Sequence, residues 1–236
     1  MCRMFAYHGT SVREVALLRD ALVKSARHDT RHNWSHGDGH GFVIVARDSM
    51  HVYKSVRPIY EDTVDLPDVR GEFLAVFHAR KASPRRIINK GSSHPYMETW
   101  ERSTIIMAHN GSLKSRELMP ELGIRDGSLV VDSELGLKFI VKNGLSQATI
   151  DKLKGYTRTA LNLFVIELVK GDDLARLYYL NHYAGQSDPR NGHYYNLYVA
   201  CLENGNAVFS STLLDNGFSG IEAKRGSLVL FGQVRR

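Results

Sequence analysis

Phe73-Leu74-Ala75-Val76-Phe77-His78-Ala79-Arg80 begins as an uninterrupted apolar run and ends on a cation. Five consecutive apolar residues are typical of a strand that is buried on both faces. A second run of this kind covers residues 104–108 and leads directly into His109-Asn110-Gly111. Strands buried on both faces need a layer of structure on each side. We therefore expect the strands and helices of the chain to pack as layers of one α+β unit.

The segments around these two runs indicate further helices and strands. A capping box, Ser11 with Glu14, predicts a helix that runs to about residue 26. Ser112 is expected to cap a short helix that Pro120 ends, and Asp132 is expected to cap a helix that runs to residue 141. No linker or repeat interrupts the pattern, which predicts one domain over residues 2–236. The other predicted elements are a strand at 2–7, a loop at 25–41, a hairpin at 42–46 and 50–56, a helix at 147–156, and strands at 161–169, 175–183, 196–202, 207–211 and 227–231.

Composition narrows the classes of protein to which the chain can belong. The 236 residues are 43% hydrophobic and 24% charged, as in ordinary folded, water-soluble proteins. No stretch approaches the roughly 18 apolar residues of a membrane helix, and the N-terminus lacks the apolar region of a signal peptide. We therefore expect a cytoplasmic protein without a membrane partner. The net charge is +6, but the basic residues are scattered and lack interleaved aromatic residues, which argues against a nucleic-acid partner.

The chain has two cysteines, Cys2 and Cys201, too few for a disulfide framework. Cys201 lies in an apolar, strand-like run and is expected to be a buried structural thiol. Cys2 follows Met1 directly, and removal of Met1 would leave a thiol and a free α-amine on one residue. With pKa values of about 7.7–8.0 for the amine and about 8.5 for the thiol, the amine can accept the thiol proton at neutral pH. On position alone, a small buried hydrophobe on the first strand is the commoner explanation.

Several short motifs in a fixed order favour a catalytic role for Cys2 instead. The motifs are Met1-Cys2-Arg3, His36-Gly37-Asp38-Gly39-His40-Gly41, His78-Ala79-Arg80 with Ser83, His94-Pro95, His109-Asn110-Gly111 and Asp132-Ser133-Glu134. Together they resemble the class II glutamine amidotransferases, a family of N-terminal nucleophile hydrolases, and most closely its short, single-domain type. The resemblance covers roughly residues 2–140. Relatives usually carry Trp at position 40 and an aromatic or apolar residue at position 81, where this chain has His40 and Lys81.

The resemblance implies a fold and a reaction. The fold is a four-layer αββα sandwich, in which two antiparallel sheets lie face to face with helices outside. In the reaction, Cys2 attacks the side-chain amide of glutamine, forms a γ-glutamyl thioester and releases ammonia, and water then releases glutamate. Asn110 and Gly111 would donate to the oxyanion of the tetrahedral intermediate. A side chain at position 111 would be expected to crowd the attacking sulfur.

The resemblance also assigns the amino-acid head of the substrate. Arg80, assisted by the hydroxyl of Ser83 where relatives commonly have Thr, would bind the α-carboxylate, and Asp132 would bind the α-ammonium. No metal or cofactor is implied, and a separate ammonia-accepting synthase subunit is a possible partner. Without that context, Arg80 would be an ordinary surface ion pair, Asp132 an N-cap, and Asn110-Gly111 a hairpin turn.

Two other functions remain open at this point. Hydrolysis of a different γ-glutamyl amide would use the same groups, because every such substrate carries the same head. A metal-binding module without enzymatic activity is suggested by four histidines, which recur every four residues near Asp38. Glycines and polar residues between them disfavour the helix that would align their side chains. These histidines are His28, His32, His36 and His40.

Overall fold

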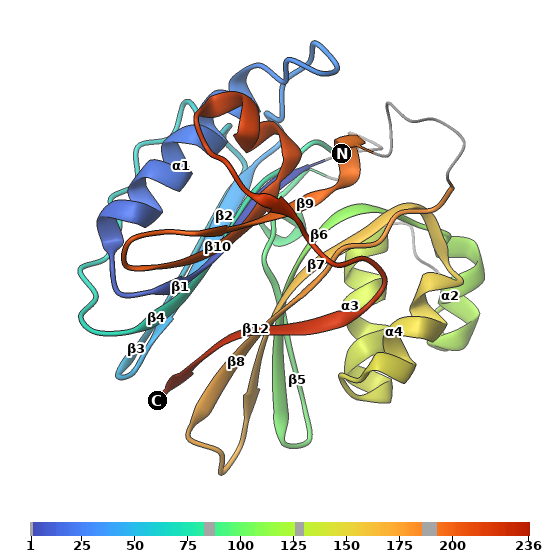
Figure 1. Ribbon diagram of the computed structural model, residues 1–236. Coiled ribbons are helices and arrows are strands. Elements are labelled where there is room, and N and C mark those ends of the chain that lie inside the picture. Colours follow the sequence, from blue (N-terminus) through green and yellow to red (C-terminus); the bar gives the residue numbers. More distant parts are fainter. Residues whose placement is uncertain (1, 83–87, 126–129, 186–192) are drawn as a thin grey trace.

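The computed structural model describes residues 2–82, 88–125, 130–185 and 193–236 (Figure 1). Its strands pair in two antiparallel sheets. The first has seven strands in the order β11-β9-β10-β1-β4-β2-β3, and the second has five in the order β12-β8-β7-β6-β5. The strands of the first sheet are β1 (Arg3–Gly9), β2 (His40–Ala46), β3 (Ser49–Ser55), β4 (Phe73–Ala79), β9 (Leu197–Cys201), β10 (Gly205–Ser210) and β11 (Ile221–Glu222). Those of the second are β5 (Tyr96–Trp100), β6 (Ser103–Leu113), β7 (Thr157–Val169), β8 (Leu174–Leu180) and β12 (Leu228–Arg235).

Helices cover the outer face of each sheet. On the first sheet lies α1 (Val12–Arg27), and on the second lie α2 (Ser115–Glu121), α3 (Asp132–Asn143) and α4 (Gln147–Lys154) (Figure 1). Two short 3₁₀ helices, η1 (Lys90–Ser92) and η2 (Ser211–Asn216), occupy connections. The layers therefore follow the predicted αββα order. No helix in the described part of the chain is long and apolar enough to cross a membrane.

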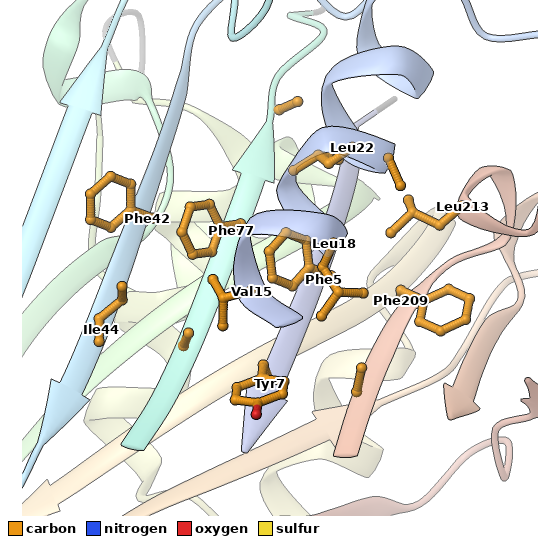
Figure 2. Close-up of a cluster of buried hydrophobic side chains, with 14 of the residues drawn as sticks. Phe5, Tyr7, Val15, Leu18, Leu22, Phe42, Ile44, Phe77, Phe209 and Leu213 are labelled. Atoms are coloured by element: carbon orange, nitrogen blue, oxygen red, sulfur yellow. The ribbon is translucent and has the colours of Figure 1, made fainter. Parts of the chain in front are cut away.

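The alternation of side chains along a strand explains why the runs at 73–77 and 104–108 are apolar at every position. In β1, Phe5 and Tyr7 point outward and pack under Leu18 and Leu22 of α1 (Figure 2). The intervening side chains point inward to the core between the two sheets, where Met4 of β1 packs among residues of both. A third core joins the second sheet to α3 and α4. Because both faces of a central strand are buried, apolar residues occupy every position.

The chain between β6 and α2 differs from the prediction. β6 continues to Leu113, pairing with β7 down to Thr157, so Ser112 lies in the strand and does not cap a helix. The N-cap of α2 is Lys114, and Pro120 lies inside the helix, one residue before its end. The long partner strand β7 decided this outcome, because a ladder with a neighbouring strand overrides a local capping preference.

Two further expectations were wrong. The N-cap of α3 is Val131, so Asp132 is the first residue of the helix and not its cap. Cys201 is exposed at the end of β9, and its thiol lies 3.0 Å from Asn206 Oδ1. β9 has only the two-residue β11 as its outer neighbour. The end of β9 is therefore poorly covered, although its sequence is apolar.

Candidate active site

Cys2 lies at the start of β1, next to the second sheet. Its side chain is buried, and its backbone nitrogen donates to Asn110 Oδ1 over 2.9 Å. Asn110 is on β6, so this bond joins the first sheet to the second across 108 residues of sequence. The sulfur of Cys2 lies 3.8 Å from the carbonyl oxygen of Lys81. The structure thus brings together two of the residues singled out from the sequence.

In the side-chain amide of Asn110, the oxygen has a hydrogen-bond partner, whereas the nitrogen has none among the described residues. Its Oδ1 accepts from Cys2, while its Nδ2 is buried without a hydrogen-bond partner among the described residues. Buried amide nitrogens are nearly always paired, and leaving one unpaired costs about 1–3 kcal/mol. A donor held at that cost beside a thiol fits a group that develops negative charge only during a reaction.

Gly111 is required by the packing of the second sheet. Its φ is +152°, and a Cβ there would collide with the carbonyl group of Ala160 on β7 and lie 2.8 Å from His109 Nε2. The neighbouring strand therefore excludes a side chain at this position, and crowding of the sulfur by such a side chain stays a prediction. β6 has an irregularity directly after this position, between Gly111 and Leu113.

His109 ties the site to α3. Its Nε2 donates to the carbonyl of Ala160 at 3.2 Å, which leaves Nδ1 to accept from the hydroxyl of Ser133 at 2.8 Å. Burial lowers the pKa of His109, so the neutral ring is favoured. The ring holds the beginning of α3 against β6.

Asp132 stands next to Ser133 at that helix start and is partly exposed. Its Oδ2 accepts from the backbone N–H of Leu113 at 2.8 Å, and its Oδ1 accepts from the N–H of Ser133 at 2.9 Å. Each carboxylate oxygen can accept a second hydrogen bond. The carboxylate is therefore oriented by the backbone and can still receive a ligand's ammonium.

Arg80 follows β4 and is 5% exposed. Its Nη1 donates to Ser92 Oγ at 3.1 Å, and its backbone N–H donates to the carbonyl of Gly39 at 2.8 Å. The side chain of Asp38 accepts from the N–H of Ala82 at 2.8 Å. The loop motif around Asp38 and Gly39 thus shapes the segment that carries Arg80. Ser83 lies outside the described residues.

His40 and Lys81, the two residues that depart from the pattern of the relatives, both make hydrogen bonds within the fold. His40 is the first residue of β2, and its Nε2 lies 3.0 Å from Asp62 Oδ2 in a buried pair. Burial lowers the pKa of His40, although Asp62 acts in the opposite direction. Lys81 donates from Nζ to the carbonyl of Ser35 at 3.0 Å and lies 4.9 Å from the ring centroid of Trp34.

Tyr96 is a residue of this region that the sequence did not single out. Its hydroxyl donates to the carbonyl of Ser92 at 2.8 Å, and burial raises its pKa. The charge of Arg80 acts in the opposite direction and lowers the pKa of Tyr96. Tyr96 also lines a cleft of about 480 Å³ between η1 and α3. β5, which carries Tyr96, was missed because residues 96–100 mix polar and apolar side chains on an exposed edge strand.

The four spaced histidines do not converge. His36 contacts Asp29 at 2.9 Å, His40 contacts Asp62, and His32 stacks on Trp34 with ring centroids 4.7 Å apart. Among the described residues, no three potential ligand side chains gather as a metal site would require. Nothing in this part of the chain therefore favours the metal-binding alternative.

Comparison with known proteins identifies solved structures of similar fold. No protein-family model and no curated protein sequence matches the chain. A glutamine phosphoribosylpyrophosphate (PRPP) amidotransferase from B. subtilis, complexed with ADP and GMP, aligns over 100% of this chain and 49% of its own, with a TM-score of 0.61 and 16% identity. A second structure, the allosteric regulatory enzyme of purine biosynthesis, aligns over 98% of this chain and 49% of its own, with a TM-score of 0.62 and 17% identity.

The chain thus spans about half the length of each of these two proteins. At such identities the likeness is one of fold. The two face-to-face antiparallel sheets, with helices on both outer faces, form the αββα fold that the sequence predicts, and this chain shares its fold with the two structures.

Proposed function

We propose that the chain is a glutaminase of the class II glutamine amidotransferase type, with Cys2 as its nucleophile after removal of Met1. The observation that carries the proposal is the pairing of Cys2 with Asn110. One end of that amide orients the nitrogen of Cys2 over 2.9 Å, and its other end is a buried donor without a partner among the described residues. In this proposal Cys2 supplies the nucleophile and its base, and Asn110 beside it supplies an oxyanion donor.

The reaction follows from these groups. The α-amine of Cys2 takes the thiol proton, and the sulfur attacks the γ-carbonyl carbon of glutamine. Asn110 Nδ2 and the N–H of Gly111 donate to the oxygen that becomes negative. The α-ammonium returns its proton to the leaving nitrogen as the C–N bond breaks, which releases ammonia and leaves a γ-glutamyl thioester. Water, deprotonated by the same amine, then attacks the thioester carbon. As the C–S bond breaks, glutamate leaves and the α-ammonium returns the proton to the sulfur of Cys2.

The charges at the edge of the site suit the head of the substrate. Arg80 follows β4 of the first sheet and Asp132 opens α3, which covers the second sheet, so the two opposite charges are held on separate elements. Ser83 is included in the carboxylate site by its place in the motif alone. A separate ammonia-accepting synthase chain is the partner that we propose for released ammonia.

A diazo-ketone analogue of glutamine tests the nucleophile. The reagent should add once per chain, at Cys2, whereas exposed Cys201 should react only with general thiol reagents. Intact mass and peptide mapping measure both. A Cys2→Ala variant that keeps full activity, or a chain retaining Met1 that works as fast as the processed one, would exclude this mechanism.

A substrate panel separates the two rival substrates. Glutamine and a set of larger γ-glutamyl amides share the head group and differ only in the leaving amine. If kcat/KM is highest for glutamine, the chain is a glutaminase. Preference for a larger amide by tenfold or more would keep the Cys2 chemistry and reassign the substrate to another γ-glutamyl compound.

A further inference from the structure

The backbone of Cys2 has no strand partner. Pairing of β1 with β4 begins at Arg3 opposite Ala79, and pairing with β10 begins only at Phe5 opposite Phe209. Cys2 therefore lies beyond both ladders. A residue past the last rung of a sheet moves freely unless a neighbouring side chain holds it.

Asn110 Oδ1 holds the nitrogen of Cys2 from the facing sheet, and Arg3 anchors the chain next to Cys2 within the first sheet. The Arg3 side chain points to the opposite face from Cys2 and is completely buried. Nε donates to Asp29 Oδ2 at 3.2 Å, and Nη1 donates to the carbonyl of Tyr194 at 3.4 Å. The guanidinium also stacks 3.6 Å from the centroid of the Tyr194 ring. Burial lowers the pKa of Arg3 to about 10, so the group is still a cation at neutral pH.

Asp29 is the hub that holds Arg3. Its Oδ2 also meets His36 Nε2 at 2.9 Å and the hydroxyl of Tyr194 at 2.7 Å, and its Oδ1 accepts from the N–H of Arg31 at 3.1 Å. Burial acts to raise the pKa of Asp29, but the bond from His36 and the charge of Arg3 lower it well below its ordinary value. The carboxylate is therefore ionised and has donors from three separate segments of the chain.

A buried ion pair of this kind is weak evidence for a purely stabilising role. Taking an ion pair out of water costs several kcal/mol per ion, and well-packed apolar residues in its place are often as stable or more so. Arg3 also has an Nη2 without a partner among the described residues. A polar network of this kind, one residue from the nucleophile, fixes geometry at some cost in free energy.

We propose that Arg3 is a positioning residue for Cys2, held by Asp29 and Tyr194, so that the sulfur and nitrogen of Cys2 meet Asn110 and the substrate in one geometry. The inference rests on the proposed function. Substrate binding should not depend on Arg3, because its side chain lies on the face of β1 away from Cys2.

Arg3→Met tests the proposal, since it keeps an unbranched apolar stem and removes the guanidinium with its charge and hydrogen bonds. A displacement of Cys2 by about 1 Å should lower kcat roughly 10²-fold, with KM changed less than twofold. Arg3→Lys, which keeps the charge but loses the stack and the planar fork, should fall between Arg3→Met and the wild type. Asp215→Asn is the control, because it changes a partly exposed partner of Arg31 nearby without touching Arg3.

Amide hydrogen exchange provides a readout independent of turnover. In folded Arg3→Met, residues 3 and 4 should exchange at least tenfold faster, while the middle of β4 stays unchanged and Asp215→Asn resembles the wild type. Unchanged exchange at residues 3 and 4, or a kcat of Arg3→Met within threefold of the wild type, overturns the positioning role. Equal losses in kcat and substrate affinity with faster exchange in β4 mean a general structural role, which also overturns it. A wild-type chain that hydrolyses no γ-glutamyl amide contradicts the proposed function instead, and the exchange result then decides the inference by itself.

Discussion

The two sides of the candidate site are built differently. On the nucleophile side, Cys2, Asn110 and Gly111 lie at or within strands of two facing sheets, and the Asn110 side chain is fully buried. On the head-group side, Arg80 follows a strand in a loop and Asp132 opens a helix at a partly exposed position. Rigid strands hold groups to within a few tenths of an ångström, whereas loops and helix starts offer charges to a ligand that arrives from solvent. The first side should therefore govern kcat and the second KM.

The largest effect is expected at Asn110. Asn110→Ala should remove an oxyanion donor and lower kcat roughly 10²–10³-fold, about 3–4 kcal/mol, with little change in KM. Asn110→Asp sharpens the test, because it keeps an acceptor for the nitrogen of Cys2 but no donor, and it should be as slow as the alanine variant. Steady-state kinetics measures both. A raised KM at unchanged kcat would move Asn110 to the binding side.

Arg80→Lys should act on the opposite parameter. A point charge cannot reproduce the planar fork that binds a carboxylate, and hydrogen bonds to charged groups contribute about 1.5–3 kcal/mol. We expect KM to rise roughly 10–100-fold for glutamine and for any larger γ-glutamyl amide alike, with kcat nearly kept. Arg176→Lys, which alters a surface ion pair with Asp172, is the matched control. If kcat falls and KM stays constant, the division between the two sides is wrong.

Asp132→Asn should have a smaller and more selective effect. The asparagine keeps an acceptor oxygen for one of the two backbone N–H groups, of Leu113 or Ser133, and its amide NH2 replaces the acceptor of the other. Because position 132 is partly exposed, that other N–H can turn to solvent and the helix start should survive. Binding of glutamine should weaken more than binding of an analogue without the α-amino group, because only glutamine leaves an ammonium unpaired. Inhibition constants of both compounds against wild type and variant give the comparison. Equal losses would mean that Asp132 only accepts hydrogen bonds from the backbone and does not bind the α-ammonium of the substrate.

The smallest effect concerns stability in acid. Burial holds the pKa of His94 well below its ordinary value, and the charges of His78, His109, Arg80 and Lys54 add to this. A histidine whose folded pKa is lowered stabilises the fold fully above the unfolded value of about 6.5. That contribution is lost as pH falls below it, by up to about 1.4 kcal/mol per pH unit. Melting temperature should therefore drop from pH 6.5 to 5.

His94→Gln isolates this contribution. The glutamine does not titrate, so the melting temperature of the variant should depend less on pH over the same window, whatever its value at pH 7. Parallel curves for variant and wild type would assign the acid sensitivity to other groups, of which buried His78 is the next candidate.

Much of this molecule was predictable from local pattern. The runs at 73–77 and 104–108 became the central strands β4 and β6, and the helix after Ser11 and the hairpin after Gly41 formed as expected. Their periodicity reports burial directly, because a side chain's environment in a layered fold repeats with its element. The motifs placed Cys2, Arg80, Asn110 and Asp132 in one candidate site, and the structure brings Cys2 and Asn110 within hydrogen-bond distance.

Other features, such as the length of β6 and the exposure of Cys201, depended on the tertiary structure. The extension of β6 past Ser112 depended on β7, about 50 residues later, and the exposure of Cys201 depended on how short β11 is. Tyr96 was not singled out from the sequence. Arg3 belongs to the first motif, but its buried pairing with Asp29 could not be predicted, because the two residues are 26 positions apart and meet only in the fold. The sequence by itself determined which elements form and which side chains carry chemistry, since both follow from local residue types. Only the folded chain decided which polar groups are paired and which are left to a substrate, because that depends on contacts across the two sheets.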